Sequence, residues 1–174
     1  MKKIFVNVDG SSRGNPGESS IGVLITDDRG HVLEQVSKLI GRTTNNAAEY
    51  KALIEGIRLA IRLAPDEAVF LTDNQLVANQ VNGFYQVREP NLQYLNQVAL
   101  DLLAQLPRWR VNFVERDVNH AAHRLAEAAF RERNRLERER NQLFRDIEAY
   151  LQDLPLDDLH KVLAYLRSLH APGM

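Results

Sequence analysis

The sequence predicts an α/β fold: a mixed five-stranded sheet, with three antiparallel strands followed by two parallel strands, helices on both faces and a C-terminal helical hairpin. Two observations carry this prediction. Strand-like and helical segments alternate after an opening run of three strand-like segments, which is typical of sheets covered by helices. From about residue 119 onward the apolar periodicity is helical throughout.

The first 39 residues predict a three-stranded antiparallel meander. Residues 3–9 alternate apolar and polar side chains, and residues 20–27 and 31–39 are two further strand-like runs. The segment 10–17 (GSSRGNPG) is dense in turn formers and predicts a loop. Asp28, Arg29 and Gly30 form a tight hairpin signal between the second and third runs.

The pattern then becomes helical. Thr44, Asn45 and Asn46 are N-cap candidates for a helix whose apolar residues continue to Ala64, and Pro65 stops it. The next predicted elements are a strand, two helices and a last strand: 68–72, 74–81, 91–106 and 109–115.

Composition excludes several classes of protein. The 174 residues contain no cysteine, which rules out disulfides and cysteine-bound zinc. No apolar run approaches the roughly 20 residues that a membrane-spanning helix needs, so we expect a cytoplasmic protein. The net charge is −1, from 22 basic and 23 acidic residues. Nucleic-acid binders usually carry a basic surplus, so a nucleic-acid function must rest on motifs.

Three acidic residues occupy positions that predict a metal site. Asp9 ends the first predicted strand, Glu49 lies in the first turns of the first helix, and Asp73 follows the fourth strand. If the fourth strand pairs beside the first, the two aspartates meet at the crevice where such sheets place their sites. Carboxylate ligands suit Mg²⁺, and two ions about 4 Å apart serve phosphodiester hydrolysis. Taken singly, each acid is more simply a turn former or a partner of the helix dipole.

Four segments together resemble the signature segments of the type 1 ribonuclease H family. They are 9–17 (DGSSRGNPG), 44–50 (TNNAAEY), 72–77 (TDNQLV) and 115–126 (ERDVNHAAHRLA). The resemblance covers residues 1–130. It implies a metal-dependent endonuclease that cuts the RNA strand of an RNA/DNA hybrid, with two Mg²⁺ or Mn²⁺ ions in the active complex.

The resemblance also assigns roles to individual residues. Asp9, Glu49 and Asp73 match the family's catalytic, metal-binding carboxylates. The segment 10–17 resembles the part that lies along the minor groove of the hybrid. Short amides and hydroxyls suit recognition of 2′-hydroxyls, although turn formation and helix capping explain the same residues. The substrate-binding positions implied are Gly10, Ser11, Asn15, Thr44, Asn45, Asn46 and Gln75.

His123 stands where the family has a fourth metal-binding aspartate. Imidazole removes one negative charge and is a poor ligand for Mg²⁺ but an acceptable one for Mn²⁺. Three interpretations remain open. His123 is a direct ligand that favours Mn²⁺, or it acts through water or as a proton carrier, or it is an ordinary surface histidine in a degraded site.

The predicted C-terminal extension, 131–174, lies outside the resemblance. Its first residues mix arginine and glutamate, which supply either a basic patch or a helix laced with ion pairs. Apolar residues recur at helical spacing from Leu136 to Leu154 and from Leu159 to Leu169. A lone helical hairpin buries little. The two helices therefore cover one another, pack on the nuclease domain or form a homodimer.

Two function classes follow from these observations. The first is the hybrid-specific endonuclease. The second is a catalytically weakened hybrid-binding or scaffolding protein that assembles through its C-terminal helices, and metal-dependent cleavage separates the two. A resolvase or exonuclease on the same fold is a third class, but it leaves the segment 10–17 and the segment 44–46 without a purpose.

Overall fold

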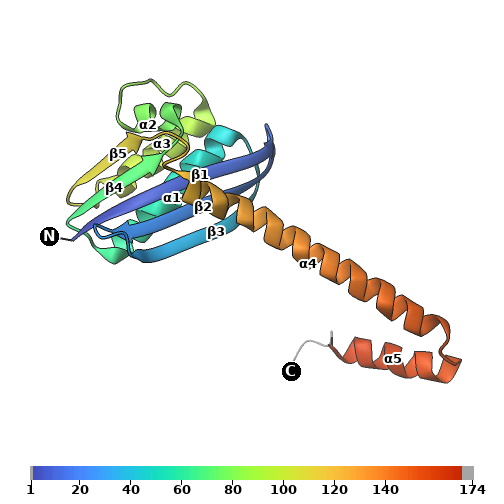
Figure 1. Cartoon of the computed structure of the whole chain (residues 1–174). Helices are drawn as coiled ribbons and strands as arrows, with labels where there is room; N and C mark the ends of the chain where they lie inside the picture. Colours follow the sequence, from blue (N-terminus) through green and yellow to red (C-terminus); the bar gives the residue numbers. More distant parts are fainter. Residues whose placement is uncertain (1, 170–174) are drawn as a thin grey trace. The chain divides into compact units, whose positions relative to one another are not determined.

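The computed structural model describes residues 2–169 and confirms the predicted mixed sheet (Figure 1). The strand order is β3-β2-β1-β4-β5. β1, β2 and β3 pair antiparallel, whereas β4 runs parallel to β1 and β5 runs parallel to β4. The strands are β1 Lys3–Gly14, β2 Gly17–Asp27, β3 Val32–Thr43, β4 Glu67–Thr72 and β5 Trp109–Phe113.

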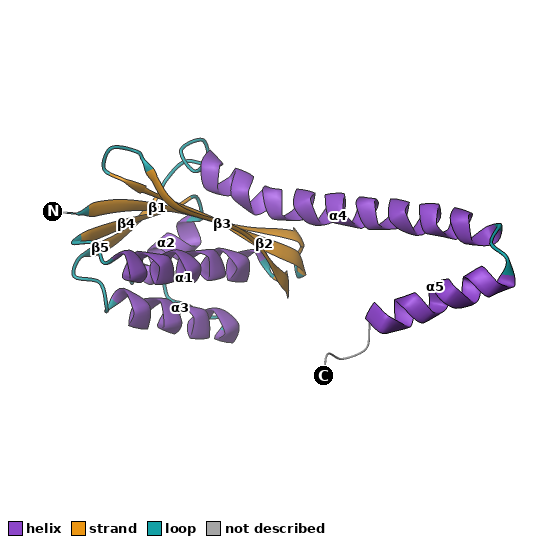
Figure 2. Cartoon of the chain, turned by 90° about the horizontal axis from the view of Figure 1, so that it is seen from below, coloured by secondary structure: helices purple, strands orange, loops and turns teal. Residues whose placement is uncertain are grey.

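Helices cover both faces of this sheet. The helices are α1 Asn45–Leu63, α2 Gln75–Val81, α3 Pro90–Leu103, α4 His120–Gln152 and α5 Leu156–Leu169. α1 and α3 lie on one face, and the first turns of α4 lie on the other (Figure 2). α1 begins where the sequence predicts, because the Thr44 side chain accepts a hydrogen bond from the Ala47 N–H at 3.3 Å.

The core lies between the sheet and α1. Alternate residues of β1 (Ile4, Val6 and Val8) are fully buried, as are Leu53 and Ile57 of α1. Each such side chain contributes about 1.5–3 kcal/mol relative to an exposed one. This packing holds α1 over β1.

The prediction of a loop at 10–17 is wrong. β1 continues to Gly14, which pairs with Gly17 at the start of β2, so the turn is confined to Asn15 and Pro16. Asp9 therefore does not end its strand. It lies just beyond the last pair between β1 and β4, Asn7 with Leu71. Most residues of 10–17 have high turn propensity. Strand pairing between β1 and β2 overrides that propensity everywhere except at the tip of the hairpin.

Two glycines let two helices approach the sheet beside Asp9. A Cβ atom on Gly10 would lie 2.3 Å from the backbone N of Glu49 in α1. A Cβ atom on Gly22, which pairs with Asp9 across β1 and β2, would lie 2.0 Å from the carbonyl O of Ala122 in α4. Both distances are inside van der Waals contact. Glycine at these two positions is therefore what allows α1 and α4 to approach from opposite faces.

The chain divides into two compact units, residues 1–132 and 133–174, and the division falls inside α4. The predicted boundary lies between residues 130 and 131. Residues 170–174 of the predicted extension lie outside the described part of the chain. Among residues 2–169, none of the helices is both long and apolar enough to cross a membrane.

We expect Gly22→Ala to destabilise the protein by about 3 kcal/mol or more, because its methyl group overlaps the α4 backbone. Gly30→Ala is the matched control. A Cβ there meets nothing within 4 Å, so it carries only the cost of a positive φ, about 1 kcal/mol. Urea unfolding measures both variants. Equal losses would show that α4 is not held by this close approach.

Candidate metal centre

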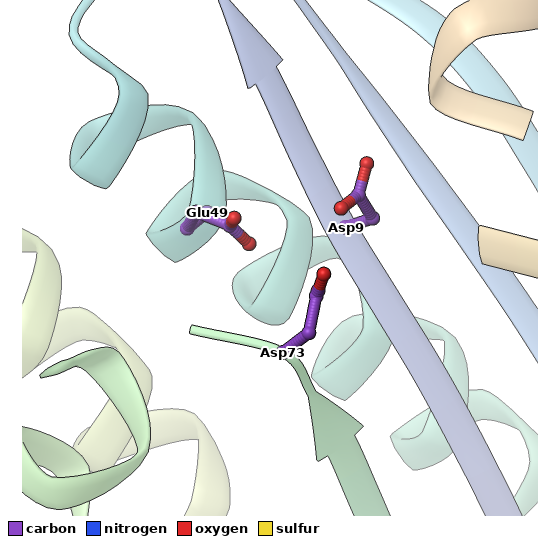
Figure 3. A group of neighbouring side chains, drawn as sticks. All are labelled: Asp9, Glu49 and Asp73. Carbon is purple, nitrogen blue, oxygen red and sulfur yellow. The ribbon is translucent and has the colours of Figure 1, made fainter. Parts of the chain in front are cut away.

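Three carboxylates meet where β4 ends beside β1, in the middle of the strand order (Figure 3). Asp9 comes from β1, Glu49 from α1, and Asp73 follows β4 directly. One oxygen from each lies within 4.8 Å of the others. β4 pairs parallel to β1, which brings Asp73 beside Asp9, and the Gly10 N–H donates to Glu49 Oε2 at 3.1 Å. The arrangement predicted from the sequence is therefore present, although Asp9 lies within its strand.

The electrostatics of this cluster favour a cation. Burial raises the pKa of Glu49 well above its usual value, and the charges of Asp9 and Asp73 raise it further. Burial also raises the pKa of Asp9, with Asp73 as the second cause. Oxygen ligands that repel one another in a buried place are the donor set that Mg²⁺ prefers. The residues present thus fit a divalent cation.

Asn119 fixes the orientation of Asp73. Its side chain is fully buried, and its Nδ2 donates to Asp73 Oδ1 and to the carbonyl O of Val8, both at 2.8 Å. Its Oδ1 accepts from Asn7 Nδ2 at 3.1 Å. A buried amide with all these partners is rigid. Asn119 therefore ties Asp73 to β1.

His123 contacts the cluster through Asp9. Its Nδ1 lies 3.2 Å from Asp9 Oδ2, and its Nε2 lies 3.2 Å from a guanidinium nitrogen of Arg116. A guanidinium has donors only, so Nε2 accepts and the ring proton is on Nδ1, where it donates to Asp9. Both ring nitrogens are thus engaged by protein groups in this structure.

The pocket at this site contains most of the residues that the sequence singled out. Its lining is Asp9, Gly10, Ser11, Asn45, Glu49, Asp73, Asn74, Gln75, Arg116 and His123. Asn74 and Arg116 were missed. Arg116 stands in a short loop, where an arginine is most simply a solvated charge, and Asn74 is also explained as the N-cap of α2. The sequence offered one indication that Asn74 and Arg116 belong to the site: both stand in segments that were predicted to form it, 72–77 and 115–126.

The other three predicted residues, Asn15, Thr44 and Asn46, lie beside the pocket lining. Asn15 Oδ1 accepts from the Asn45 N–H at 3.1 Å, and Asn46 Oδ1 accepts from Asn74 Nδ2 at 3.3 Å. Thr44 caps α1. In this structure these side chains hold residues of the lining in place.

α4 also holds the β1–β2 hairpin, through a residue that the sequence did not reveal in this role. Ser11 Oγ donates to Glu127 Oε1 at 3.0 Å, and the Arg13 guanidinium lies 3.6 Å from Glu127 Oε2. The same guanidinium stacks over the Phe130 ring, 4.0 Å from its centroid. One face of α4 therefore carries His123 at the metal centre and Glu127 under the hairpin.

Known proteins share the first unit of this chain. The family described as reverse transcriptase-like matches residues 7–129. The bifunctional protein Rv2228c of Mycobacterium tuberculosis is 41% identical over 128 residues, which are 73% of this chain and 35% of that protein. The chain thus aligns with about a third of that relative's length.

Two solved structures resemble the same unit. Ribonuclease H1 of Halobacterium salinarum is 33% identical with a TM-score of 0.73, over 75% of this chain and 98% of that one. LC11-RNase H1, isolated from compost by a metagenomic approach and solved in complex with an RNA/DNA hybrid, is 33% identical with a TM-score of 0.70. That match covers 74% of this chain and 97% of the other.

We expect Glu49→Gln to stabilise the metal-free protein at neutral pH. The folded-state pKa of Glu49 is raised, so its contribution to stability is intact below the unfolded-state pKa and is lost as the pH rises through the folded-state pKa. Urea unfolding in chelator from pH 4 to pH 8 should show the wild type losing stability relative to the variant. Glu148→Gln, at an exposed position, is the control. Parallel pH profiles for wild type and Glu49→Gln would contradict the electrostatic account.

Proposed function

This chain belongs to the type 1 ribonuclease H family, and we propose that it is a metal-dependent endonuclease that hydrolyses the RNA strand of RNA/DNA hybrids. The observation that carries the proposal is the cluster of Asp9, Glu49 and Asp73, because each acid comes from a segment that resembles the family's signatures. The hybrid seen in the complex of LC11-RNase H1 supports the choice of substrate.

Asp9, Glu49 and Asp73 would hold two divalent cations, Mg²⁺ or Mn²⁺, which supply an activated water and stabilise the leaving oxygen of the phosphodiester. The chain's own groups prepare this site. Asn119 orients Asp73, and the Gly10 N–H orients Glu49, so neither carboxylate has to reorganise. Such preorganisation is where a protein scaffold contributes most to catalysis.

The pocket rim provides groups that suit a hybrid. Ser11, Asn45 and Gln75 present hydroxyl and amide groups, which can donate to or accept from the 2′-hydroxyls of RNA. Arg116 adds a positive charge beside the carboxylates, where a phosphate would enter. The net charge of the chain is −1, whereas nucleic-acid binders usually carry a basic surplus. A local positive charge at the site can still attract a phosphate, because electrostatic attraction depends on where charges lie.

The contacts of His123 favour an indirect role for it. The Nε2 lone pair accepts from Arg116 and the Nδ1–H donates to Asp9, so direct ligation would first require Arg116 to leave. We infer that His123 acts mainly by orienting Asp9, a role that differs from all three interpretations of the sequence. A catalytically weakened hybrid-binding protein is the alternative, because the group of acids that the described residues 2–169 form at the centre has three members.

Asp73→Asn should abolish cleavage of a labelled RNA/DNA hybrid in both Mg²⁺ and Mn²⁺, because it removes a metal-binding charge while keeping the Asn119 contact possible. A fall of at least about 10³-fold in rate is expected for loss of a residue of this kind. Hybrid binding, measured by fluorescence anisotropy in chelator, should persist. Retained hybrid binding without cleavage by the wild type, in either metal, would favour the scaffold alternative.

His123→Ala and His123→Asp report on the fourth position. If His123 orients Asp9, the alanine variant should lose rate by about 10-fold or more with both metals. The aspartate variant, which restores a fourth carboxylate, should need less Mg²⁺ for half-maximal cleavage. Titration of each metal separately measures both effects. An alanine variant with unchanged rate and metal dependence would show that His123 is an ordinary surface residue.

A further inference from the structure

The unit formed by residues 133–169 leaves its apolar side chains exposed. α5 contains no buried residue, and Leu143, Phe144, Ile147 and Tyr150 of α4 are 50–79% exposed. Only residues near the turn between the two helices, such as Leu154 and Leu159, are half-buried. The two helices of this unit therefore cover little of one another. Contiguous exposed apolar patches of this kind mark interaction sites.

Four exposed residues of α4 and the half-buried Leu154, just beyond its end, have coiled-coil spacing. Leu136, Leu143, Ile147, Tyr150 and Leu154 follow one another at steps of seven, four, three and four residues. Steps that alternate between three and four place side chains along one seam that faces a second helix. The seam is interrupted once, at Arg140.

Charge along the same stretch is divided into two halves. Residues 133–145 contain five arginines and two glutamates, a net charge of +3. Residues 146–158 contain five acids (Asp146, Glu148, Asp153, Asp157 and Asp158) and no base, a net charge of −5. Asp157 and Asp158 belong to the first turn of α5, where Lys161 pairs with Asp158 at 2.8 Å. The acids of the stretch up to residue 154 are therefore Asp146, Glu148 and Asp153, a net charge of −3. The complementary surface is the basic half of an identical helix.

We propose that residues 136–154 pair antiparallel with the same residues of a second copy, about a two-fold axis near residue 145. This arrangement sets the basic half of each helix against the acidic half of the other. It also brings Leu136 opposite Leu154 and Leu143 opposite Ile147, so the apolar seam closes on itself. Arg140 then lies opposite Tyr150, where its guanidinium can stack on the ring.

A parallel pair is disfavoured by the same charges. It would set Asp146, Glu148 and Asp153 of the two copies against one another at one end and the two arginine-rich halves against one another at the other. The antiparallel pair is closed, because both copies use one patch. The inference goes beyond the proposed nuclease function and does not depend on it, since every residue that carries it lies outside the family match at 7–129.

The mass of the full-length chain tests the pairing. Sedimentation equilibrium between 1 and 100 µM should give twice 19.8 kDa at the upper concentrations. Leu143→Asp should weaken association by roughly 100-fold or more, since each dimer loses two buried leucines. Ala149→Asp, which places the same charge off the seam on α4, is the matched control and should remain dimeric. A monomer mass for the wild type at 100 µM would overturn the proposal.

Orientation needs a second measurement. The chain has no cysteine, so Asn134→Cys provides a single site for a spin label. With the axis near residue 145, the two labels are 22 residues apart along the helix, about 33 Å at 1.5 Å per residue. A parallel pair would bring them within about 15 Å. Pulsed electron resonance that reports only the short distance would reject the antiparallel pairing even if the protein is dimeric. Hybrid cleavage enters neither measurement.

Discussion

The mutual repulsion of three carboxylates is the constraint on which the site and much of the surrounding fold depend. Asp9 and Glu49 are buried, and their pKa values are raised first by this burial and then by neighbouring carboxylates, among them Asp73. Hydrogen bonds hold two of the three side chains in place, from the Gly10 N–H to Glu49 and from Asn119 to Asp73. Gly10 admits α1 to one face of the sheet and Gly22 admits α4 to the other. The core under α1 then stabilises an arrangement that electrostatics alone would disperse.

Three residues of α4 contact Asp9 of the metal centre and the β1–β2 hairpin, at positions more than 100 residues earlier in the sequence. His123 contacts Asp9, Glu127 holds Ser11 and Arg13 of the hairpin, and Phe130 supports Arg13 from below. The hairpin and the metal centre are thus positioned by the same two turns of helix. A shift of α4 would displace both together. The close approach at Gly22 and the hydrogen bond from Ser20 Oγ to the carbonyl O of Ala126, at 2.8 Å, are two of the contacts that oppose such a shift.

Much of this was accessible from the sequence, for identifiable reasons. Strand alternation, turn residues and the Thr44 cap predicted the sheet and α1, and segment order predicted that Asp9, Glu49 and Asp73 would converge. The hairpin at 10–17 was missed because turn propensity is local whereas strand pairing is not. Arg116 and Glu127 were missed because their roles depend on distances across the fold, which residue type and spacing do not encode.

The site can assemble only after most of the first unit has been synthesised. Asp9 lies near the start of the first unit, and His123, which contacts Asp9, lies near the end of that unit. Contacts of such large sequence separation form late, after most of a domain has left the ribosome. Emerging and prematurely ended chains consequently lack the assembled centre. The proposed cleavage of hybrids would therefore be absent from a chain that is still being made.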